Sequence, residues 1–235
     1  MADARIKKLR ALLKAAGDPE DAKAQQAYLK TPLRFAGVKT AVRRGFVLEA
    51  FGRKSTRAEV EDAIRELWRT DTYDERATAL SLLKRVLIEL DIGDLPWLHA
   101  ITRDCDNWAL LDTLACDILG PLALLQGEAL FKPVRRWSTD VWMWTRRASI
   151  LVHLIPGRKQ KLAHKYAWAT FEERLPEKEF FIRKAIGWTL RECGKHYAQN
   201  VHDFLVHVGD RASGLTRREG ARNLPDKLRI PILGK

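Results

Sequence analysis

Four segments of the chain recur at a nearly constant spacing, and this repeat constrains the fold more than any other feature. They begin at Arg76 (RATALSLL), Asp112 (DTLACDIL), Arg147 (RASILVHL) and Lys184 (KAIGWTLREC), so the spacings are 36, 35 and 37 residues. Each starts with a charged residue, continues with a small or polar residue and ends in an apolar run. A period of this length accommodates two antiparallel helices, as in HEAT or armadillo repeats. The repeat therefore predicts a curved α-solenoid with a concave groove.

Helical periodicity extends along almost the whole chain, whereas alternating strand patterns are hard to find. The sequence predicts an all-α fold with helices over residues 3–16, 19–29, 39–52, 57–69, 73–91, 95–103, 107–119, 138–154, 159–175, 178–195, 197–208 and 216–223. Glycine and proline mark the expected breaks, at Gly17-Asp18-Pro19, Thr31-Pro32, Gly93-Asp94, Gly120-Pro121, Pro156-Gly157 and Leu175-Pro176. No break is long enough to link separate domains. We expect one HEAT-like domain over 1–235, with N-terminal helices over 1–56, repeats over 57–223 and an irregular or extended tail over 224–235.

The chain is strongly basic, with 42 Lys and Arg against 30 Asp and Glu and a formal charge of +12. This balance favours a polyanionic partner, with nucleic acid first and an anionic membrane surface second. There is no signal-peptide pattern and no apolar run of about 18 residues, so no membrane span is expected. Cys105, Cys116 and Cys193 form no CxxC pair and suit reduced thiols in or near the core. The six histidines lack ligand spacing, so neither a metal nor another cofactor is expected.

Asp112 is the one acid at a repeat position where Arg76, Arg147 and Lys184 carry bases. If the four positions share an orientation, a basic groove would contain one carboxylate near its middle. An acid repels a polyanion, so its presence in such a groove indicates a specific task. A structural ion pair between Asp112 and a neighbouring cation would explain it equally well, and the sequence leaves both interpretations open.

Two tryptophans are placed to share a surface with Asp112. Trp108 precedes it by four residues and so lies on the same helix face. Trp188 lies one turn beyond the counterpart position two repeats later, and Arg147 is the counterpart in the repeat between. A single tryptophan is more often a core residue, so the interpretation depends on the combination of all four side chains.

These residues lie in segments that resemble the AlkD-type DNA alkylation repair family, whose members are alkylpurine DNA glycosylases built from HEAT-like repeats. The resembling segments are DNWALLDTLACDILG, MWTRRASILVHL, FFIRKAIGWTLREC, LTRREGARNL and, near the N-terminus, YLKTPLRFAGVKTAVRR from Tyr28 to Arg44. The resemblance covers about residues 25–224. Its most specific marks are W-x-x-x-D at Trp108 and Asp112, R-R-A at 146–148 and K-A-I-G-W at 184–188.

The resemblance implies a role for each matched residue and a reaction. Asp112 would be the catalytic carboxylate, Trp108 and Trp188 the aromatic walls beside the lesion, and Arg147 a phosphate contact. The reaction would be hydrolysis of the N-glycosidic bond of a cationic N3- or N7-alkylated purine in duplex DNA, leaving an abasic site, with limited insertion of the base into the protein. The residue chemistry agrees, because a carboxylate beside the sugar stabilises an oxocarbenium-like transition state and can orient water.

A set of mostly basic residues, which includes Arg147, is expected to hold the duplex, mainly through its phosphates. They are Tyr28, Arg43, Arg44, Arg76, Arg146, Arg147, Lys184, Arg217 and Arg218. Two alternatives remain: a non-catalytic scaffold of the same architecture that binds distorted or branched DNA, and a HEAT-type protein–protein adaptor, which needs neither a basic groove nor this carboxylate. We expect a monomer in a reducing bacterial-type cytoplasm, associated with the nucleoid when bound to double-stranded DNA, with no membrane contact.

Overall fold

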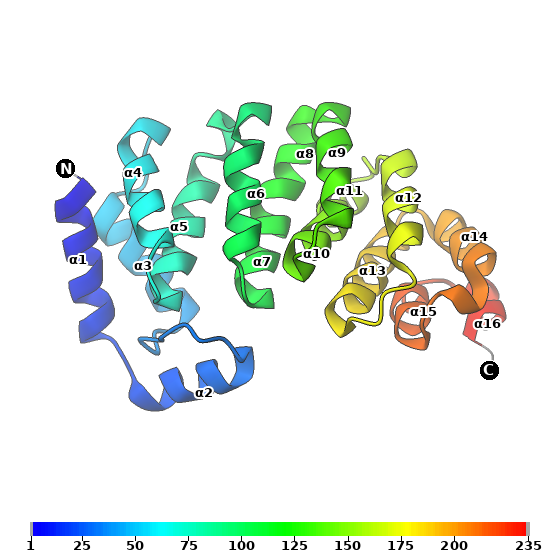
Figure 1. The fold of residues 1–235 in the computed structure, drawn as a ribbon, viewed down its shortest axis with the longest axis horizontal. Coiled ribbons are helices and arrows are strands. Elements are labelled where there is room, and N and C mark those ends of the chain that lie inside the picture. Colours follow the sequence, from blue (N-terminus) through cyan, green and yellow to red (C-terminus); the bar gives the residue numbers. More distant parts are fainter. Residues whose placement is uncertain (1, 234–235) are drawn as a thin grey trace. The chain divides into compact units, whose positions relative to one another are not determined.

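Helices are the regular elements throughout residues 2–233, the part of the chain that the computed structural model describes (Figure 1). The one extended pairing within that range is an isolated bridge between Arg34 and Thr72. The all-α prediction is therefore confirmed. Contacts between Cα atoms divide the chain into two compact units: unit 1 is Met1–Leu90 with Asp106–Thr113, and unit 2 is Asp91–Cys105 with Leu114–Lys235. The single domain and the concave groove stay predictions.

Unit 1 contains the N-terminal helices and most of α7. Its elements are α1 (Ala2–Ala15), α2 (Pro19–Leu29), α3 (Thr40–Phe51), α4 (Arg57–Trp68), α5 (Tyr73–Arg85), the 3-10 turn η1 (Leu87–Glu89) and α7 (Trp108–Leu114). α4 illustrates how the sequence specifies them: the backbone N of Thr56 donates to Glu59 Oε2 at 2.7 Å in a capping box. Val60, Ile64 and Leu67 then recur at helical spacing and are fully or almost fully buried. This face packs against α5.

α2 is the least embedded helix of unit 1, because none of its residues is buried. It runs crosswise to α1 and α3 (Figure 1). Asp18 caps it by accepting hydrogen bonds from the backbone N of Glu20 and Asp21, both at 2.9 Å. Gly37 lies against this cap with φ +78°, and a Cβ there would come within 2.0 Å of the Asp18 carbonyl oxygen. Only glycine fits this close approach, which holds the start of α2 beside the following loop.

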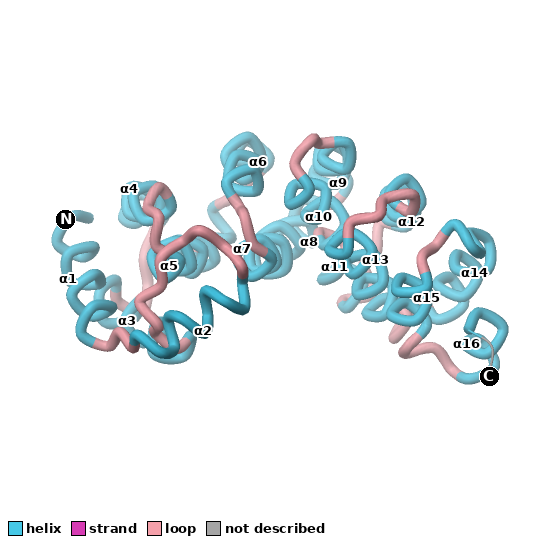
Figure 2. Tube along the Cα trace, turned by 60° about the horizontal axis from the view of Figure 1, so that its bottom comes forward, coloured by secondary structure: helices cyan, strands magenta, loops and turns pink. Residues whose placement is uncertain are grey.

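Unit 2 contains the remaining helices. They are η2 (Ile92–Asp94), α6 (Leu95–Asp104), the π-helical turn η3 (Ala115–Leu119), α8 (Gly120–Gln126), α9 (Glu128–Arg135), η4 (Arg136–Thr139), α10 (Met143–Leu151), α11 (Leu154–Arg158), α12 (His164–Arg174), α13 (Phe180–Cys193), α14 (Ala198–Val208), η5 (Gly209–Arg211), α15 (Gly214–Ala221) and α16 (Asp226–Leu233). Figure 2 shows α9 and α12 on one side of this unit and α10 and α13 on the other. The two layers enclose a core that includes the fully buried Phe171, Ile186 and Leu190. The helix pairs expected from the repeat are thus present.

Several predicted boundaries are wrong. Helices also cover 120–126 and 128–135, and the expected break at Gly120-Pro121 lies inside a helical run. Pro121 is tolerated because the preceding π-helical turn changes the hydrogen-bond pattern that a proline would otherwise break. Gly157 likewise lies inside α11, where a Cβ would come within 2.5 Å of Cys193 Sγ, so this glycine serves packing. The tail forms α16, which packs against α14 and α15.

The helical run Trp108–Gln126 is the one segment among the described residues that is long and apolar enough to cross a membrane, judged by length and composition alone. Half of its most apolar stretch is buried inside the protein. Asp112 and Asp117 also interrupt its apolar character. We interpret the run as a core helix.

Candidate functional site

The start of α7 is fixed by a side-chain cap. The Asn107 side-chain oxygen accepts hydrogen bonds from the backbone N of Ala109 and of Leu110, both at 3.1 Å. Asparagine is a preferred cap because it satisfies backbone donors that have no partner inside the helix. Asn107 is 1% exposed, so the cap is rigidly held. It sets where Trp108 and Asp112 lie on the following turns.

A second contact ties this cap to the end of α2. Thr31 Oγ1 donates to Asp106 Oδ2 at 2.7 Å, and Asn107 Nδ2 donates to Asp106 Oδ1 at 2.8 Å. The first of these hydrogen bonds joins residues 75 positions apart in the chain, and the second joins neighbours. They link the segment after α2 to the residue that starts α7. Sequence reasoning did not identify Thr31, Asp106 or Asn107, although an asparagine directly before an apolar helical run is a recognisable cap signal.

Tyr28 and Trp108 form an aromatic pair beside this cap. Their ring centroids are 5.6 Å apart and their planes are nearly perpendicular, at 87°. This edge-to-face geometry is favourable for aromatic rings. Tyr28 remains 72% exposed and Trp108 is partly buried, so the pair presents a wall at the surface of unit 1.

Asp112 follows Trp108 by one helical turn in α7 and is partly buried. Residues separated by four positions share a helix face, so the carboxylate and the aromatic pair belong to one face. Within unit 1, the structure therefore places Trp108 against Tyr28, with Asp112 one helical turn further along α7. The π-helical turn of residues 115–119 begins three residues beyond Asp112. Such turns occur frequently at functional sites.

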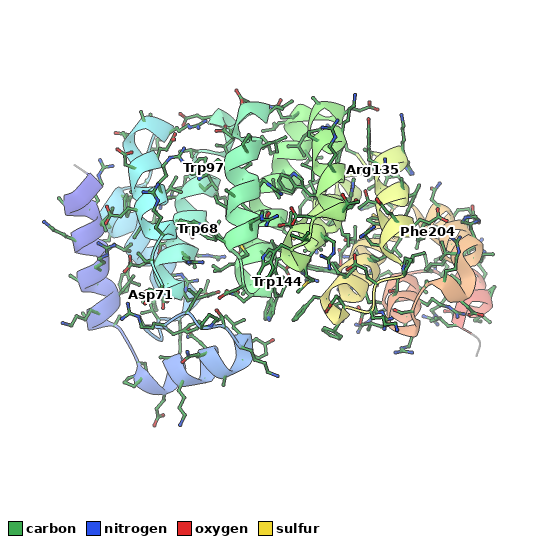
Figure 3. The ribbon with its side chains drawn as sticks, in the orientation of Figure 1. Trp68, Asp71, Trp97, Arg135, Trp144 and Phe204 are labelled. Atoms are coloured by element: carbon green, nitrogen blue, oxygen red, sulfur yellow. The ribbon has the colours of Figure 1, made fainter. Side chains whose placement is uncertain are left out.

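The other predicted residues of unit 1 differ in their surroundings. Arg43 is 6% exposed, and its Nη1 donates to the fully buried Asp74 at 3.2 Å. Arg44, its neighbour, is exposed and has no partner among the described residues. Arg76 lies over the ring of Trp68, labelled in Figure 3, with 5.3 Å from its guanidinium carbon to the ring centroid. Their contacts with DNA stay predictions.

In unit 2, Arg147 and Trp188 lie on α10 and α13. Arg147 is 3% exposed, its Nη1 donates to the Phe181 carbonyl oxygen, and its guanidinium carbon lies 5.7 Å from the centre of the Phe181 ring. Trp188 is partly buried and packs against the core of unit 2. Burial of Arg147 is unusual for a residue expected to contact phosphates, because such contacts need access to the solvent side.

Three further predicted cations of unit 2 are paired with carboxylates. Arg146 bonds Glu177 at 2.9 Å, and Lys184 bonds Glu219 at 2.9 Å. The hydrogen bond from Lys184 is the largest influence that lowers the pKa of Glu219 below its usual range. Arg217 bonds Asp210 at 2.8 Å. By contrast, Arg218 is exposed and has no partner among the described residues.

The three cysteines are free thiols. Cys105 and Cys193 are buried and Cys116 is partly buried, which confirms their predicted positions in or near the core. Burial raises the pKa of Cys193 to about 12, so this thiol stays protonated at neutral pH and is a poor nucleophile. Within residues 4–233, no group of three or more His, Cys, Asp or Glu side chains could hold a metal ion.

The fold and site define an all-α repeat protein with a carboxylate one helical turn from an aromatic pair, of which Tyr28 is exposed and Trp108 partly buried. A model of the DNA alkylation repair enzyme family matches residues 9–224. The chain therefore belongs to this family. Among curated proteins, none shows significant sequence similarity to the chain.

Two solved structures share the fold. A predicted DNA alkylation repair enzyme from Enterococcus faecalis is 21% identical, with a TM-score of 0.80 over 89% of this chain and 97% of its own. AlkD2 from Streptococcus mutans is 14% identical, with a TM-score of 0.52 over 98% of this chain and 100% of its own. At these identities the likeness concerns the fold alone, and it confirms the HEAT-like class expected from the repeat.

Proposed function

We propose that this protein is a DNA glycosylase that hydrolyses the N-glycosidic bond of cationic N3- or N7-alkylated purines in duplex DNA and leaves an abasic site. The observation that carries the proposal is the position of Asp112 on the same face of α7 as Trp108, whose ring packs edge-on against the exposed Tyr28. Membership of the DNA alkylation repair enzyme family supports DNA as the substrate.

The chemistry suits a site with one carboxylate and no strong acid. An alkylated purine already carries a positive charge, so it departs without being protonated. As the bond to the sugar lengthens, positive charge develops on the deoxyribose. A carboxylate fixed beside the sugar stabilises that charge, and it can also orient the attacking water. Asp112 is the residue to which we assign both tasks.

The aromatic side chains recognise the cation and the sugar. Contact between a cation and an aromatic face is worth about 0.5–2 kcal/mol, and it is strongest when water is excluded. We assign this contact to Trp108 and Tyr28. The exposed ring of Tyr28 is accessible to a ligand. The expected aromatic contact of Trp188 and phosphate contact of Arg147 form no part of this proposal, because both residues lie in unit 2 and Arg147 is buried against Phe181.

The decisive experiment measures base release from duplex DNA methylated at purine ring nitrogens, separated by chromatography. Asp112→Asn keeps the shape of the side chain and removes its charge, so we expect base release to fall by about 10²–10³-fold. Binding to unmodified duplex should be retained, since loss of a negative charge does not weaken contact with phosphates. Asp62→Asn is the matched control: Asp62 is an exposed carboxylate on α4 of the same unit, and its loss changes the net charge equally.

The outcomes separate the candidate functions. Equal base release by the wild type and Asp112→Asn would remove this carboxylate from the mechanism. Salt-sensitive duplex binding without base release from any methylated substrate would instead identify a non-catalytic DNA-binding protein of the same architecture.

A further inference from the structure

A cavity of about 350 Å³ lies in unit 2, and none of its lining residues comes from α10 or α13, the helices that carry Arg146, Arg147 and Lys184. Its walls come from the end of α9, from η4 and from α12. α12 packs against both α9 and η4. In Figure 3, Arg135 is labelled at this cavity, beside α12. Figure 2 shows α9 and α12 on the side of unit 2 opposite α10 and α13.

Three cations line the cavity: Lys132, Arg135 and Arg136, here called the α9 cation cluster. All three side chains are exposed, and none has an acidic partner among the described residues. This contrasts with Arg146 and Lys184, which are bound by Glu177 and Glu219. The α9 cation cluster therefore offers charge to a ligand without first breaking an ion pair.

The rest of the lining supports binding of an anion. Glu173 is the single carboxylate among the lining residues, and it accepts a hydrogen bond from the buried Ser138 at 2.8 Å and lies 3.5 Å from Arg174. The hydroxyls of Thr139 and Tyr166 also lie in the wall, where they donate to the Arg136 carbonyl oxygen at 3.1 Å and to Glu128 Oε2 at 3.4 Å. Among the lining residues, three positive charges thus face one negative charge that is already bonded. The negative end of the α9 dipole amounts to about half an elementary charge, so it balances only part of this excess.

The spacing of the cations points to a repeating anion. Lys132, Arg135 and Arg136 stand at i, i+3 and i+4, and Arg136 retains helical backbone angles, so all three share one face. Neighbours on such a face have Cβ atoms about 5–6 Å apart, and one DNA strand advances about 3.4 Å per phosphate along the helix axis. Long, exposed side chains can therefore reach successive phosphates of one strand.

We infer that the α9 cation cluster is a second DNA-contact surface, which binds the phosphodiester backbone of a duplex segment other than the one that Arg146 and Lys184 are predicted to hold on the opposite side of unit 2. The inference rests on the proposed function only in its choice of DNA as the phosphate source. Such a surface would let the protein hold two duplex segments at once and transfer between them during a search for damage.

The test compares duplex affinity across salt concentrations for two triple variants. In the first, Lys132→Gln, Arg135→Gln and Arg136→Gln are combined. In the matched control, Arg53→Gln, Lys54→Gln and Arg69→Gln remove three exposed cations of unit 1 that likewise have no partner among the described residues. Each phosphate contact contributes roughly 0.9 to the slope of log affinity against log salt. We expect the first variant to lower this slope for unmodified duplex by about two to three, with the control unchanged.

Stoichiometry and small phosphates complete the test. At saturation, the wild type should bind two short duplexes and the first variant one. An unchanged slope and stoichiometry in the first variant would overturn the inference. Calorimetry with inorganic phosphate and with a 5′-mononucleotide identifies the source of the phosphate. Suppose that the wild type binds these ligands and the first variant does not, while both proteins show the same salt dependence of duplex affinity. This result would assign the cavity to a small phosphate ligand and overturn the DNA assignment. The first variant should release base from a short methylated duplex as the wild type does. A failure of the DNA-contact inference would therefore leave the result of the Asp112→Asn test unaffected.

Discussion

Arg43 and Arg44 are neighbours in α3 with opposite surroundings. The guanidinium of Arg43 is buried between Asp74 and Tyr73, with 5.6 Å from its carbon to the tyrosine ring centroid. Asp74 also accepts a hydrogen bond from the backbone N of Ala36 at 2.8 Å. The Arg43–Asp74 pair thus holds together α3, α5 and the loop before α3, whereas Arg44 faces solvent. The sequence alone gives no reason to distinguish the two arginines, because only the fold shows that Asp74 lies beside Arg43.

The two arginines should therefore respond differently to the same substitution. Arg43→Ala leaves the buried Asp74 unpaired and should lower the free energy of unfolding by about 3–5 kcal/mol. Arg44→Ala should change it by less than about 0.5 kcal/mol. Urea denaturation of both variants checks the difference. A small loss for Arg43→Ala would contradict its structural role and return it to the predicted DNA contacts.

His153 is a buried residue that affects stability through protonation. Its ring stacks on Phe131 at 5.0 Å, meets Phe171 edge-on at 5.8 Å and leaves Nδ1 without a hydrogen-bond partner. Burial lowers the pKa of His153 from 6.5 to about 3. Below pH 6.5 the unfolded chain therefore takes up a proton that the folded protein refuses. The contribution of this pKa shift to the free energy of unfolding is complete above pH 6.5 and is lost progressively as the pH falls to about 3.

A variant without the buried imidazole should resist acid better. His153→Phe should show a flatter dependence of the free energy of unfolding on pH between 6.5 and about 3, with a difference of a few kcal/mol at the acidic end. His196→Gln, at an exposed histidine, is the control and should follow the wild type. Denaturant titrations at several pH values make the comparison; parallel curves for His153→Phe and the wild type would rule out this role.

At the scale of elements, the start of α7 positions the proposed chemistry. The Asn107 cap and the Thr31–Asp106 hydrogen bond determine the first turn, which sets the positions of Trp108 and, one turn later, of Asp112. Positioning matters because a displacement of about 1 Å at a catalytic group can reduce a rate by about 10²-fold. The proposed function therefore predicts that the cap couples local helix stability to base release.

Removing and restoring the cap oxygen tests this coupling. Asn107→Ala should cost about 1 kcal/mol of stability and lower base release by about tenfold or more. Asn107→Ser keeps an acceptor at the cap and should recover most of both losses. Thermal unfolding and base-release chromatography provide the two measurements. If Asn107→Ala lost stability but released base at the wild-type rate, the cap would be structural only.

The repeat made the second helix of each pair predictable, because α5, α7, α10 and α13 carry the four aligned segments. The helices that follow α7 were not predictable, because Gly120-Pro121 signals a helix break and the π-helical turn overrides this signal. Within the site, Trp108 and Asp112 follow from their spacing. The contact of Trp108 with Tyr28 required the structure, since it joins residues that are distant in sequence.

At the scale of the whole molecule, several ion pairs join residues that are about one repeat apart. They are Arg34–Asp71, Arg103–Asp140, Arg146–Glu177, Arg158–Glu192 and Lys184–Glu219, with separations of 37, 37, 31, 34 and 35 residues. Opposite charges separated by one period were a readable signal in the sequence. They explain why the count of 42 Lys and Arg overstates the number of cations that are available to a ligand.

This pairing changes what a bound phosphate does at Arg146 or Lys184. To reach either side chain, the phosphate must displace Glu177 or Glu219, so it substitutes one anion for another and releases few mobile ions from solution. Displacement also severs a link between neighbouring repeats. If a duplex contacts these two residues as predicted, its binding would therefore weaken the packing between the neighbouring repeats of unit 2.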